Sequence, residues 1–408
     1  MHAGFRRGLA GGVVIFLAAV WAVTLAQRLG GSGWWWLELM RFLPYPLLLV
    51  PCALAFVLAW PLGWGWRVAS AATFALVASV GMGLSWHGAA EPVAGSVRLM
   101  TWNAKTVQAS ERSGGIEALM REVAAHRPDI VVMQDANALR RVHDAAPAAP
   151  MLGLPHVWGQ GQYLVASRFP LEGCADVTAG SLTYARCTVH ADASTFELRT
   201  VHFESPRAGL LAARHEGAGG VDAWRANLDE RLLQSRALAA SLAGAPRPLI
   251  VAGDLNAAES SDVVGQLLAS GLRDAFSSAG RGYGYTYGHT LRPRFSFLRI
   301  DHILVSPQVI AHRSFTGTAD ASDHRPVIAD LVVEANELVI ATHGRGFWVL
   351  GNIAPLRQAN AAIAAKELHL FTPAVALRGG GGASISYTLK TVPKRLSLQI
   401  VDSAGGIM

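Results

Sequence analysis

Three long stretches without a charged residue fill most of the first ninety positions and limit what this chain can fold into more than any other feature. They cover residues 8–27, 42–66 and 68–90. A bilayer core about 30 Å thick is crossed by about 20 helical residues, so each stretch is long enough to span it. Clustered tryptophans follow the first stretch and surround the end of the second, as is typical of membrane interfaces. We expect residues 1–95 to form a membrane anchor of three transmembrane helices; the alternative is a cleaved signal peptide followed by a buried core.

Few charges set the orientation of this anchor. Arg6 and Arg7 precede the first stretch, and with the N-terminus inside, the six flanking arginines divide three against three between the two sides of the membrane. Because the charges before the first span usually dominate, we expect the N-terminus to lie in the cytoplasm. Three spans then place everything after Glu91 outside the cytoplasm, on the periplasmic face of a bacterial inner membrane.

The pattern of apolar and polar residues changes at Val97. Short runs rich in Val and Ile, bounded by Gly, Pro, Asp and Ser, alternate with amphipathic helical patterns that begin near Ile116 and Trp224. We expect strands at Val97–Trp102, Asp129–Gln134, Tyr163–Ser167, Ala185–His190, Leu198–Phe203, Leu249–Gly253, Ile300–Val305 and Val327–Val333. Mixed strands and helices over residues 97–333 favour a layered α/β domain.

Acids and amides recur at the ends of these strands. They are Asn103, Asp135, Asp254, Asn256, Asp301 and the pair Asp323-His324. Each one alone is an ordinary turn former or helix cap. Gathered on one rim, their oxygen atoms suit Mg²⁺ or Mn²⁺ better than zinc. The chain has only three cysteines, which excludes a zinc site built from cysteines.

Six motifs occur in an order that resembles a known family. They are Thr-Trp-Asn (101–103), Pro-Asp-Ile-Val-Val-Met-Gln-Asp (128–135), Thr-Val-His-Phe (200–203), Val-Ala-Gly-Asp-Leu-Asn (251–256), Arg-Ile-Asp-His-Ile-Leu-Val-Ser (299–306) and Ser-Asp-His-Arg-Pro (322–326). The set resembles the endonuclease/exonuclease/phosphatase (DNase I-like) superfamily over about 97–333, in a membrane-anchored, bacterial-type member. The resemblance implies a four-layered α/β sandwich with two packed, mostly antiparallel sheets and the site at one rim.

The same resemblance implies a metal site made by three residues. Asp135 stands where family members have a metal-binding Glu, which is one methylene longer. Asn103 resembles the Asn that helps to bind metal and phosphate, and Asp323 is the neighbouring acid expected to be a ligand. The implied cofactor is Mg²⁺, or Mn²⁺.

Five further residues take catalytic roles by resemblance. Asp254 matches the Asp that orients or deprotonates the attacking water, and Asn256 matches the amide that steadies the phosphorane oxygens. His324 matches the His that contacts the scissile phosphate, and Asp301 the Asp that orients its ring. His202 stands where DNase I-like members keep a second His near the leaving group. The set implies in-line attack of an activated water on a phosphoester.

Positive charge in the chain lies mostly outside residues 97–333. That segment holds 23 basic and 23 acidic residues, although the whole chain has a formal net charge of +6. The long-range attraction expected of a duplex-DNA nuclease is therefore weak. Arg299 and Tyr285 are expected to make local contacts with the substrate.

Cys174 and Cys187 flank a turn in which Thr178 would pair with Thr183. That register places the two cysteines opposite each other. A cross-strand disulfide, which requires an oxidising compartment, and two small buried thiols both remain open.

Residues 334–408 form a β-rich tail that resembles a different family. Residues 336–350 and the segments after them are similar to the last blade of a BNR-repeat (sialidase-like or sortilin-like) β-propeller, followed by part of a β-sandwich. One blade cannot close a propeller, so the tail borrows partners, packs on the preceding domain or is a fusion remnant. We expect no activity from it.

The resemblance implies a membrane-anchored, Mg²⁺-dependent phosphoric ester hydrolase of the nuclease, phosphodiesterase and phosphatase class. Its partners would be the membrane and a phosphoester: a phospholipid head group, a soluble phosphate ester or a nucleic acid. No obligate protein partner is inferred. The alternatives are a catalytically weak or inactive, membrane-tethered binding module of the same fold, and a DNA or RNA nuclease.

Overall fold

The computed structural model of the chain describes residues 3–29, 34–43, 45–87, 95–112, 114–191, 194–245, 248–288, 296–318, 320–333, 338–342, 346–350, 353–371, 385–391 and 397. The chain divides into two compact units, Met1–Glu334 and Ala335–Met408.

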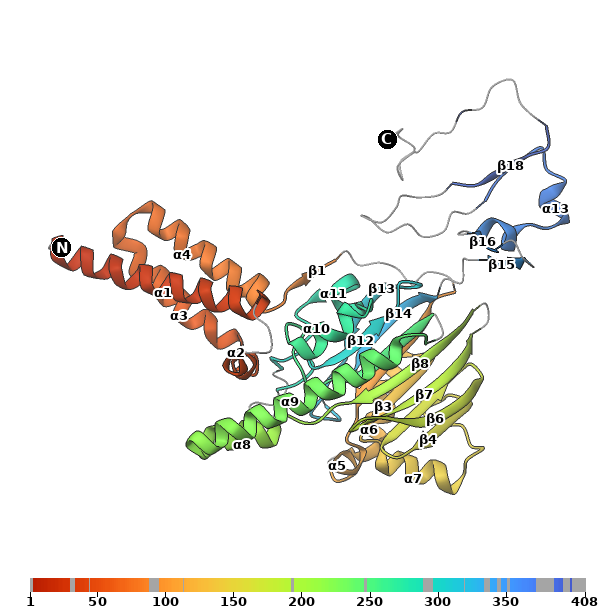
Figure 1. Ribbon diagram of the computed structural model, residues 1–408, viewed down its shortest axis with the longest axis horizontal. Coiled ribbons are helices and arrows are strands. Elements are labelled where there is room, and N and C mark those ends of the chain that lie inside the picture. Colours follow the sequence, from red (N-terminus) through yellow and green to blue (C-terminus); the bar gives the residue numbers. More distant parts are fainter. Residues whose placement is uncertain are drawn as a thin grey trace. The chain divides into compact units, whose positions relative to one another are not determined.

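Two six-stranded sheets form the centre of the first unit (Figure 1). The first sheet contains, in spatial order, β10 (Arg273–Asp274), β12 (Asp301–Val305), β9 (Leu249–Asp254), β8 (Ser194–His202), β7 (Leu182–Ala191) and β6 (Leu171–Ala179). The second contains β13 (Val309–Thr316), β14 (Val327–Val333), β2 (Val97–Asn103), β3 (Ile130–Gln134), β5 (Tyr163–Ser167) and β4 (His156–Gln160). The pairs β2–β3 and β8–β9 are parallel and the others antiparallel, so both sheets are mixed. All eight expected strands are present, with slightly shifted bounds.

Strand β3 shows how the layers are built. Its side chains alternate between the two faces of the sheet, as the pleat of a strand requires. Ile130 and Val132 face the core between the sheets, together with Phe196 of β8. Val131 and Met133 face the opposite way, toward an outer layer of helices. A continuous apolar run is thus buried on both sides, as a central strand needs.

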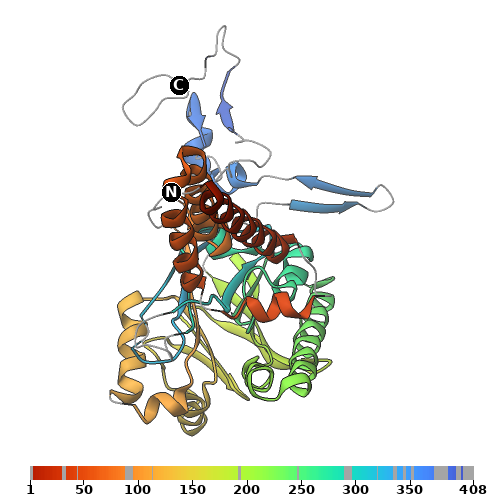
Figure 2. The ribbon, with the colours of Figure 1, turned by 90° about the vertical axis from the view of Figure 1, so that its left-hand side faces the viewer.

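Helices cover the outer face of each sheet. On the second sheet lie α5 (Thr106–Ser110), α6 (Gly115–His126) and α7 (Asn137–Ala145). On the first sheet lie α9 (Gly217–Leu242) and α10 (Asp262–Ala269), while α8 (Arg207–His215) precedes α9 and α11 (Ala275–Ala279) follows β10. Figure 2 shows the sheets between these two groups of helices. The predicted four-layered α/β sandwich is therefore confirmed.

The expectation of three membrane spans is wrong. Among the residues that the structure describes, only α1 (Ala3–Leu29) is long and apolar enough to cross a membrane, over Gly4–Gln27. Helix breakers divide the second charge-free stretch, because Pro61 lies in a 3₁₀ turn and Gly63 has φ of 124°. The segment beyond α1 is instead built from α2 (Trp35–Met40), α3 (Tyr45–Ala59), η1 (Trp60–Leu62), α4 (Trp64–Leu76) and the π-helical turn η2 (Val77–Gly81).

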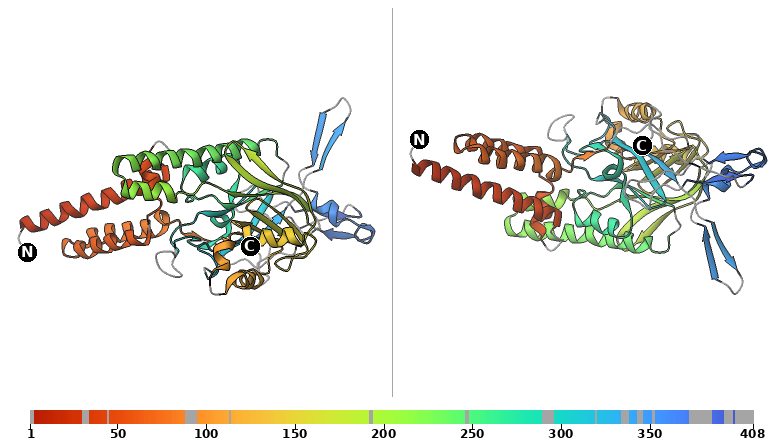
Figure 3. Two further views of the ribbon diagram at one scale, coloured as in Figure 1. Left: turned by 90° about the horizontal axis from the view of Figure 1, so that it is seen from below. Right: turned by 90° about the horizontal axis from the view of Figure 1, so that it is seen from above.

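Parts of residues 1–95 pack on the sandwich instead of forming a separate anchor. Helix α2 lies against α9 (Figure 3). There the indole Nε1 of Trp224 donates to the main-chain oxygen of Trp35 at 3.0 Å. Strand β1 (Ser85–Trp86) pairs with β11 (Arg281–Gly282). Two segments that precede β2, namely α2 and β1, therefore pack on the sandwich.

The second unit contains short paired strands. The strands β15 (Leu338–Thr342) and β16 (Gly346–Leu350) form one antiparallel pair. The strands β17 (Leu368–Leu370) and β18 (Tyr387–Leu389) form another, and between the pairs lie α12 (Ala354–Gln358) and α13 (Ala361–Ala364). The resemblance of this tail to a propeller blade stays a prediction.

Candidate active site

Parallel pairing brings the ends of four central strands to one rim of the sandwich. β2 ends at Asn103 beside the end of its parallel neighbour β3, so Asp135 follows at the same rim. β8 and β9 are also parallel, with His202 opposite Asp254. The antiparallel strand β12 begins at the same place, with Asp301 opposite Asp254. Residues from distant parts of the chain therefore meet there.

Several neighbours meet at the carboxylate of Asp254. Its Oδ2 accepts a hydrogen bond from Asn103 Nδ2 at 2.9 Å and lies 3.6 Å from His202 Nε2. Its Oδ1 accepts from the main-chain N–H of Asn256 at 2.8 Å. Burial and the charge of Asp301 raise the pKa of Asp254 above its ordinary value. A buried carboxylate with a raised pKa is a stronger base than an exposed one.

Backbone geometry explains the Gly-Asp-Leu-Asn sequence at this point. A side chain on Gly253 would collide with the main-chain oxygen of Val201 on the parallel strand, so close approach requires glycine. Asn256 adopts a left-handed φ of 47° and its Nδ2 donates to the main-chain oxygen of Phe203 at 2.9 Å. The amide of Asn256 is thereby anchored, and its own N–H is aimed at Asp254.

His324 is buried and held by contacts with several neighbouring residues. Its Nδ1 lies 2.9 Å from Asp301 Oδ2, its Nε2 lies 3.8 Å from Asp254 Oδ2, and its main-chain oxygen accepts from Trp102 Nε1 at 2.9 Å. The ring of Tyr287 packs on the imidazole at a centroid distance of 4.8 Å. Burial lowers the pKa of His324, but the charges of Asp301 and Asp254 outweigh burial and raise it to about 9. The ring is therefore protonated at neutral pH.

Several buried oxygen atoms at this rim lack a donor among the described residues. They are Asn103 Oδ1, Asp301 Oδ1 and Asp323 Oδ1. Buried polar atoms are rarely left unsatisfied, and oxygen atoms of this kind are the ligands of hard cations. The carboxylates of Asp254 and Asp301 lie close to one another beside these atoms and add further hard oxygen ligands. The donor set therefore fits a divalent cation.

The residues predicted to hold the metal do not all converge on one point. Asp135 is 33% exposed, and its Oδ1 lies 4.0 Å from His202 Nδ1. Asp323 is held by Lys105, whose Nζ lies 2.9 Å from Asp323 Oδ2. Asn103 binds Asp254 instead of facing outward. Oxygen atoms able to hold a cation thus extend beyond the predicted three residues.

A pocket of about 500 Å³ lies over these side chains. Of the predicted residues it is lined by Asn103, Asp135, His202, Asp254, Asn256 and His324. Lys105, Arg207 and Arg214 also line it and were not expected from the sequence, whereas Tyr287 belongs to the same tyrosine-containing run (282–287) as the predicted Tyr285. The only signal was position, since Lys105 and Arg207 closely follow the motifs that end β2 and β8.

Two predicted substrate contacts lie elsewhere. Arg299 is buried and forms ion pairs with Asp274 at 2.7 Å and Glu259 at 2.5 Å, so its charge is used inside the fold. Tyr285 donates its hydroxyl to the main-chain oxygen of Met82 at 3.1 Å. Both line a separate small cavity, and the pocket over Asp254 is instead reached by Tyr287. Contact of Arg299 and Tyr285 with the substrate stays a prediction, and in the structure both side chains lie at this separate cavity.

The N-terminal segment reaches the site through a buried arginine. Arg231 of α9 lies with Nη1 at 3.4 Å from Glu38 Oε1 of α2 and donates to the main-chain oxygen of Asn256 at 3.1 Å. Glu38 is also paired with Arg41 at 2.6 Å. Phe42, which follows α2, lines the pocket. Helix α2 therefore contributes to the wall and to the support of the site.

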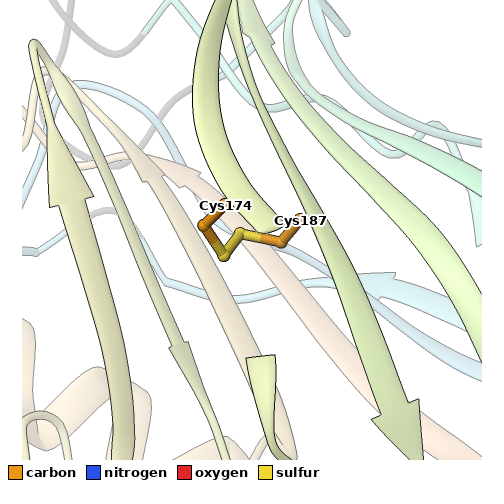
Figure 4. The surroundings of a disulfide bond; sticks show 2 residues. All are labelled: Cys174 and Cys187. Atoms are coloured by element: carbon orange, nitrogen blue, oxygen red, sulfur yellow. A yellow bond between two sulfur atoms is a disulfide. The ribbon is translucent and has the colours of Figure 1, made fainter. Parts of the chain in front are cut away.

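Cys174 and Cys187 are joined by a disulfide (Figure 4). Thr178 pairs with Thr183 in the hairpin of β6 and β7, which is the register considered from the sequence. The register shifts between Glu172 and Ala175, so Cys174 lies at a bulge. Among the described cysteines, Cys52 is free and buried.

The chain is similar to one known protein family. The model of the endonuclease/exonuclease/phosphatase family matches residues 100–324. Solved structures similar to the chain include a humanized TDP2 of D. rerio (16% identity, 59% of this chain and 100% of that chain, TM-score 0.43). Others are a family protein of Bacteroides thetaiotaomicron (17%, 60% and 100%, 0.43) and a mannosyl-6-phosphatase of the same organism (16%, 58% and 100%, 0.42). No curated protein matches the chain. Since the family model covers more than half of the sequence, the chain belongs to the endonuclease/exonuclease/phosphatase family.

Proposed function

We propose that this protein is a membrane-associated phosphoester hydrolase that uses a divalent cation. Members of its family are phosphoesterases that use divalent metals. The observation that carries the proposal is the convergence of Asn103, His202 and His324 on one carboxylate oxygen of Asp254, inside a pocket of about 500 Å³. We assign catalysis to residues 97–333 and no catalytic part to residues 334–408.

Asp254 is proposed to orient the attacking water and to accept its proton. The raised pKa of the buried carboxylate supports this role, because it improves proton acceptance near neutral pH. Asn103 and the N–H of Asn256 hold the two carboxylate oxygens in position. Fixed geometry of this kind removes the cost of reorganising the base during reaction.

His324 is proposed to stabilise the charge that develops on the phosphoryl group. Asp301 accepts from Nδ1, which keeps the ring charged and leaves Nε2 directed toward Asp254. A preorganised cation in a buried site contributes about 100- to 1000-fold in rate when it acts on developing charge. His202, oriented by Gln162 through a 2.7 Å contact at Nδ1, presents Nε2 to the same centre as a candidate donor to the leaving oxygen.

The residues proposed to hold a divalent cation are Asn103, Asp135, Asp301 and Asp323. The support is chemical: three of them carry buried oxygen atoms without a donor in the described part of the chain, and all four offer hard oxygen ligands. A ligand set made only of oxygen atoms suits both Mg²⁺ and Mn²⁺. We propose Mg²⁺ as the cation and Mn²⁺ as its substitute. When bound, such an ion polarises a phosphoryl oxygen as a Lewis acid.

The membrane association and orientation of the protein are proposed from two features. Helix α1 is long and apolar enough to span a bilayer, and Arg6 and Arg7 stand at its N-terminal end. The disulfide of Cys174 and Cys187 suits an oxidising compartment. We therefore place the catalytic unit outside the cytoplasm.

The proposal is tested with the full-length protein purified in detergent. The substrates are bis(4-nitrophenyl) phosphate, a diester, and 4-nitrophenyl phosphate, a monoester. We expect 4-nitrophenolate release from at least one of them with Mg²⁺, and loss of that release with excess EDTA. No release from either substrate with Mg²⁺ or Mn²⁺ would favour the inactive binding module.

A further inference from the structure

The pocket over Asp254 has a large apolar wall. This wall, which we call the apolar wall, consists of Phe42, Leu210, Leu211, Phe297, Leu298 and Ile300. It faces the same space as the polar residues of the site. A small hydrophilic phosphate ester has no group to place against six apolar side chains, so the wall calls for an apolar part of the substrate.

Helix α8 supplies the exposed part of the apolar wall in an amphipathic pattern. Arg207, Leu210, Leu211 and Arg214 all line the pocket, and their spacing places them on one face of the helix. Leu211 is 53% exposed, although it borders a pocket whose floor carries buried charges. Leucines between arginines match a ligand that combines an anionic group with an aliphatic chain.

The apolar wall continues into the segment that follows α1. Phe42 lies two residues beyond the end of α2 and packs edge-on against Trp224 of α9 at a centroid distance of 5.7 Å. At the other end of α2, Trp34 and Trp36 stack on each other at 5.7 Å and are 53% and 39% exposed. Exposed tryptophans beside the end of an apolar helix are typical of the membrane surface.

The end of α1 and the pocket are tied together by buried contacts. Arg41 donates to the main-chain oxygen of Gln27 in the last turns of α1 at 2.7 Å, and it pairs with Glu38 of α2. Glu38 in turn pairs with Arg231 beside Asn256. If α1 crosses a bilayer, these contacts hold the pocket at the membrane surface.

We infer that the substrate is an amphiphilic lipid phosphoester taken from the membrane, with its phosphoester at Asp254 and its aliphatic chain along the apolar wall. This inference rests on the proposed phosphoesterase activity and specifies its substrate. The balanced charge of residues 97–333 speaks against a polyanionic nucleic acid, and the apolar wall speaks against a soluble sugar phosphate.

Two matched diesters test the inference on the full-length protein in detergent with Mg²⁺. They are methyl 4-nitrophenyl phosphate and hexyl 4-nitrophenyl phosphate, used below the concentration at which the hexyl ester aggregates. In both, water attacks phosphorus, the bond to the 4-nitrophenyl oxygen breaks, and 4-nitrophenolate and an alkyl phosphate are released. We expect kcat/KM for the hexyl ester to exceed that for the methyl ester by at least about tenfold, mainly through KM, because each buried methylene adds to binding.

A preference for the hexyl ester could come from the pocket or from uptake of the ester into detergent micelles. A pair of leucine variants distinguishes these two causes. Leu211→Gln should lower the hexyl-to-methyl ratio several-fold. Leu233 of α9 has the same 53% exposure and does not line the pocket, so Leu233→Gln should leave the ratio unchanged. Both positions are exposed, so neither variant removes a buried contact.

The outcomes distinguish the inference from the proposed function. Equal kcat/KM for the two esters, or a ratio that Leu211→Gln does not change, would overturn the inference while the phosphoesterase proposal stands. Faster cleavage of a single-stranded oligonucleotide than of the hexyl ester at equal concentration would overturn it in favour of a nuclease. Absence of hydrolysis of all three substrates would overturn both.

Discussion

Arg231 and Glu38 form a buried ion pair across 193 residues of sequence, with Nη1 and Oε1 3.4 Å apart. Arg231 is 0% and Glu38 3% exposed. Because Arg231 also donates to the main-chain oxygen of Asn256, the pair connects the segment after α1 with a residue of the candidate site. The N-terminal segment is thus a structural part of the site as well as a candidate anchor.

Removing one partner of this pair should destabilise the protein. Glu38→Gln leaves the Arg231 charge buried with a weaker partner, and breaking a buried pair typically costs about 3–5 kcal/mol. We expect a clear drop in the apparent Tm of the full-length protein in detergent. Asp222→Asn, which removes a 77%-exposed partner of Arg225, should change Tm little. Equal Tm values for all three proteins would contradict the structural role of Glu38.

Two deletions test the same role through activity. Deletion of residues 1–33 leaves α2 in place and should keep hydrolysis, whereas deletion of residues 1–94 removes α2 and should abolish it.

Acid should weaken the fold through Asp274. Its carboxylate lies 2.7 Å from Arg299 Nη1 and 2.8 Å from His302 Nδ1. Burial raises the pKa of Asp274, but Arg299 and His302 outweigh burial and hold the pKa well below its usual range. The ordinary pKa of Asp is about 3.9, so this contribution is complete above about pH 5 and is lost as the pH falls further.

The measurement is Tm against pH for wild type and Asp274→Asn. The variant should be less stable at pH 7, and its Tm should fall less steeply than that of wild type between about pH 5 and pH 3. Asp222→Asn should keep the wild-type slope, because Asp222 is exposed. Parallel curves for wild type and Asp274→Asn would show that Asp274 does not contribute through its lowered pKa.

Asp135 stands where the family resemblance implies a longer Glu, and its side chain lines the pocket. Asp135 has a left-handed φ of 49° and a half-exposed side chain at the pocket. Asp135→Glu should therefore keep or raise Mg²⁺-dependent hydrolysis and lower the Mg²⁺ concentration that gives half-maximal rate. Complete loss of activity in a folded variant would mean that Asp135 is not a metal ligand.

The cysteines give a direct chemical test of the hairpin. With Cys174 and Cys187 joined, denatured and unreduced protein should contain one reactive thiol, that of Cys52. Denatured and reduced protein should contain three, which is the number of cysteines in the sequence. Three thiols before reduction, in protein prepared without reductant, would contradict the disulfide.

The sequence was informative where short-range patterns decide the structure. Strand-end residues such as Asn103, Asp254 and Asp301 could be located because buried strands read as continuous apolar runs, and parallel pairing then gathers their ends. Charge-free length could not reveal that Pro61 and Gly63 break the second stretch.

Ion pairs between residues far apart in the sequence were the second feature that could not be predicted. Arg299 seemed available for substrate because its partners Asp274 and Glu259 are 25 and 40 positions away and had no reason to be matched to it. Glu38 and Arg231 form a pair for the same kind of reason, which only the packing of α2 on α9 reveals. Buried ion pairs are not encoded by local spacing, so structure was needed to find them.

The central claim is that the protein hydrolyses a phosphoester and that Asp254 orients the attacking water and accepts its proton. It is tested most directly by the rate of Mg²⁺-dependent 4-nitrophenolate release from bis(4-nitrophenyl) phosphate by the wild-type protein, Asp254→Asn and the exposed control Asp222→Asn. We predict a loss of at least about 100-fold in kcat for Asp254→Asn at unchanged fold, and wild-type rates for Asp222→Asn. Equal rates in all three proteins would contradict the account.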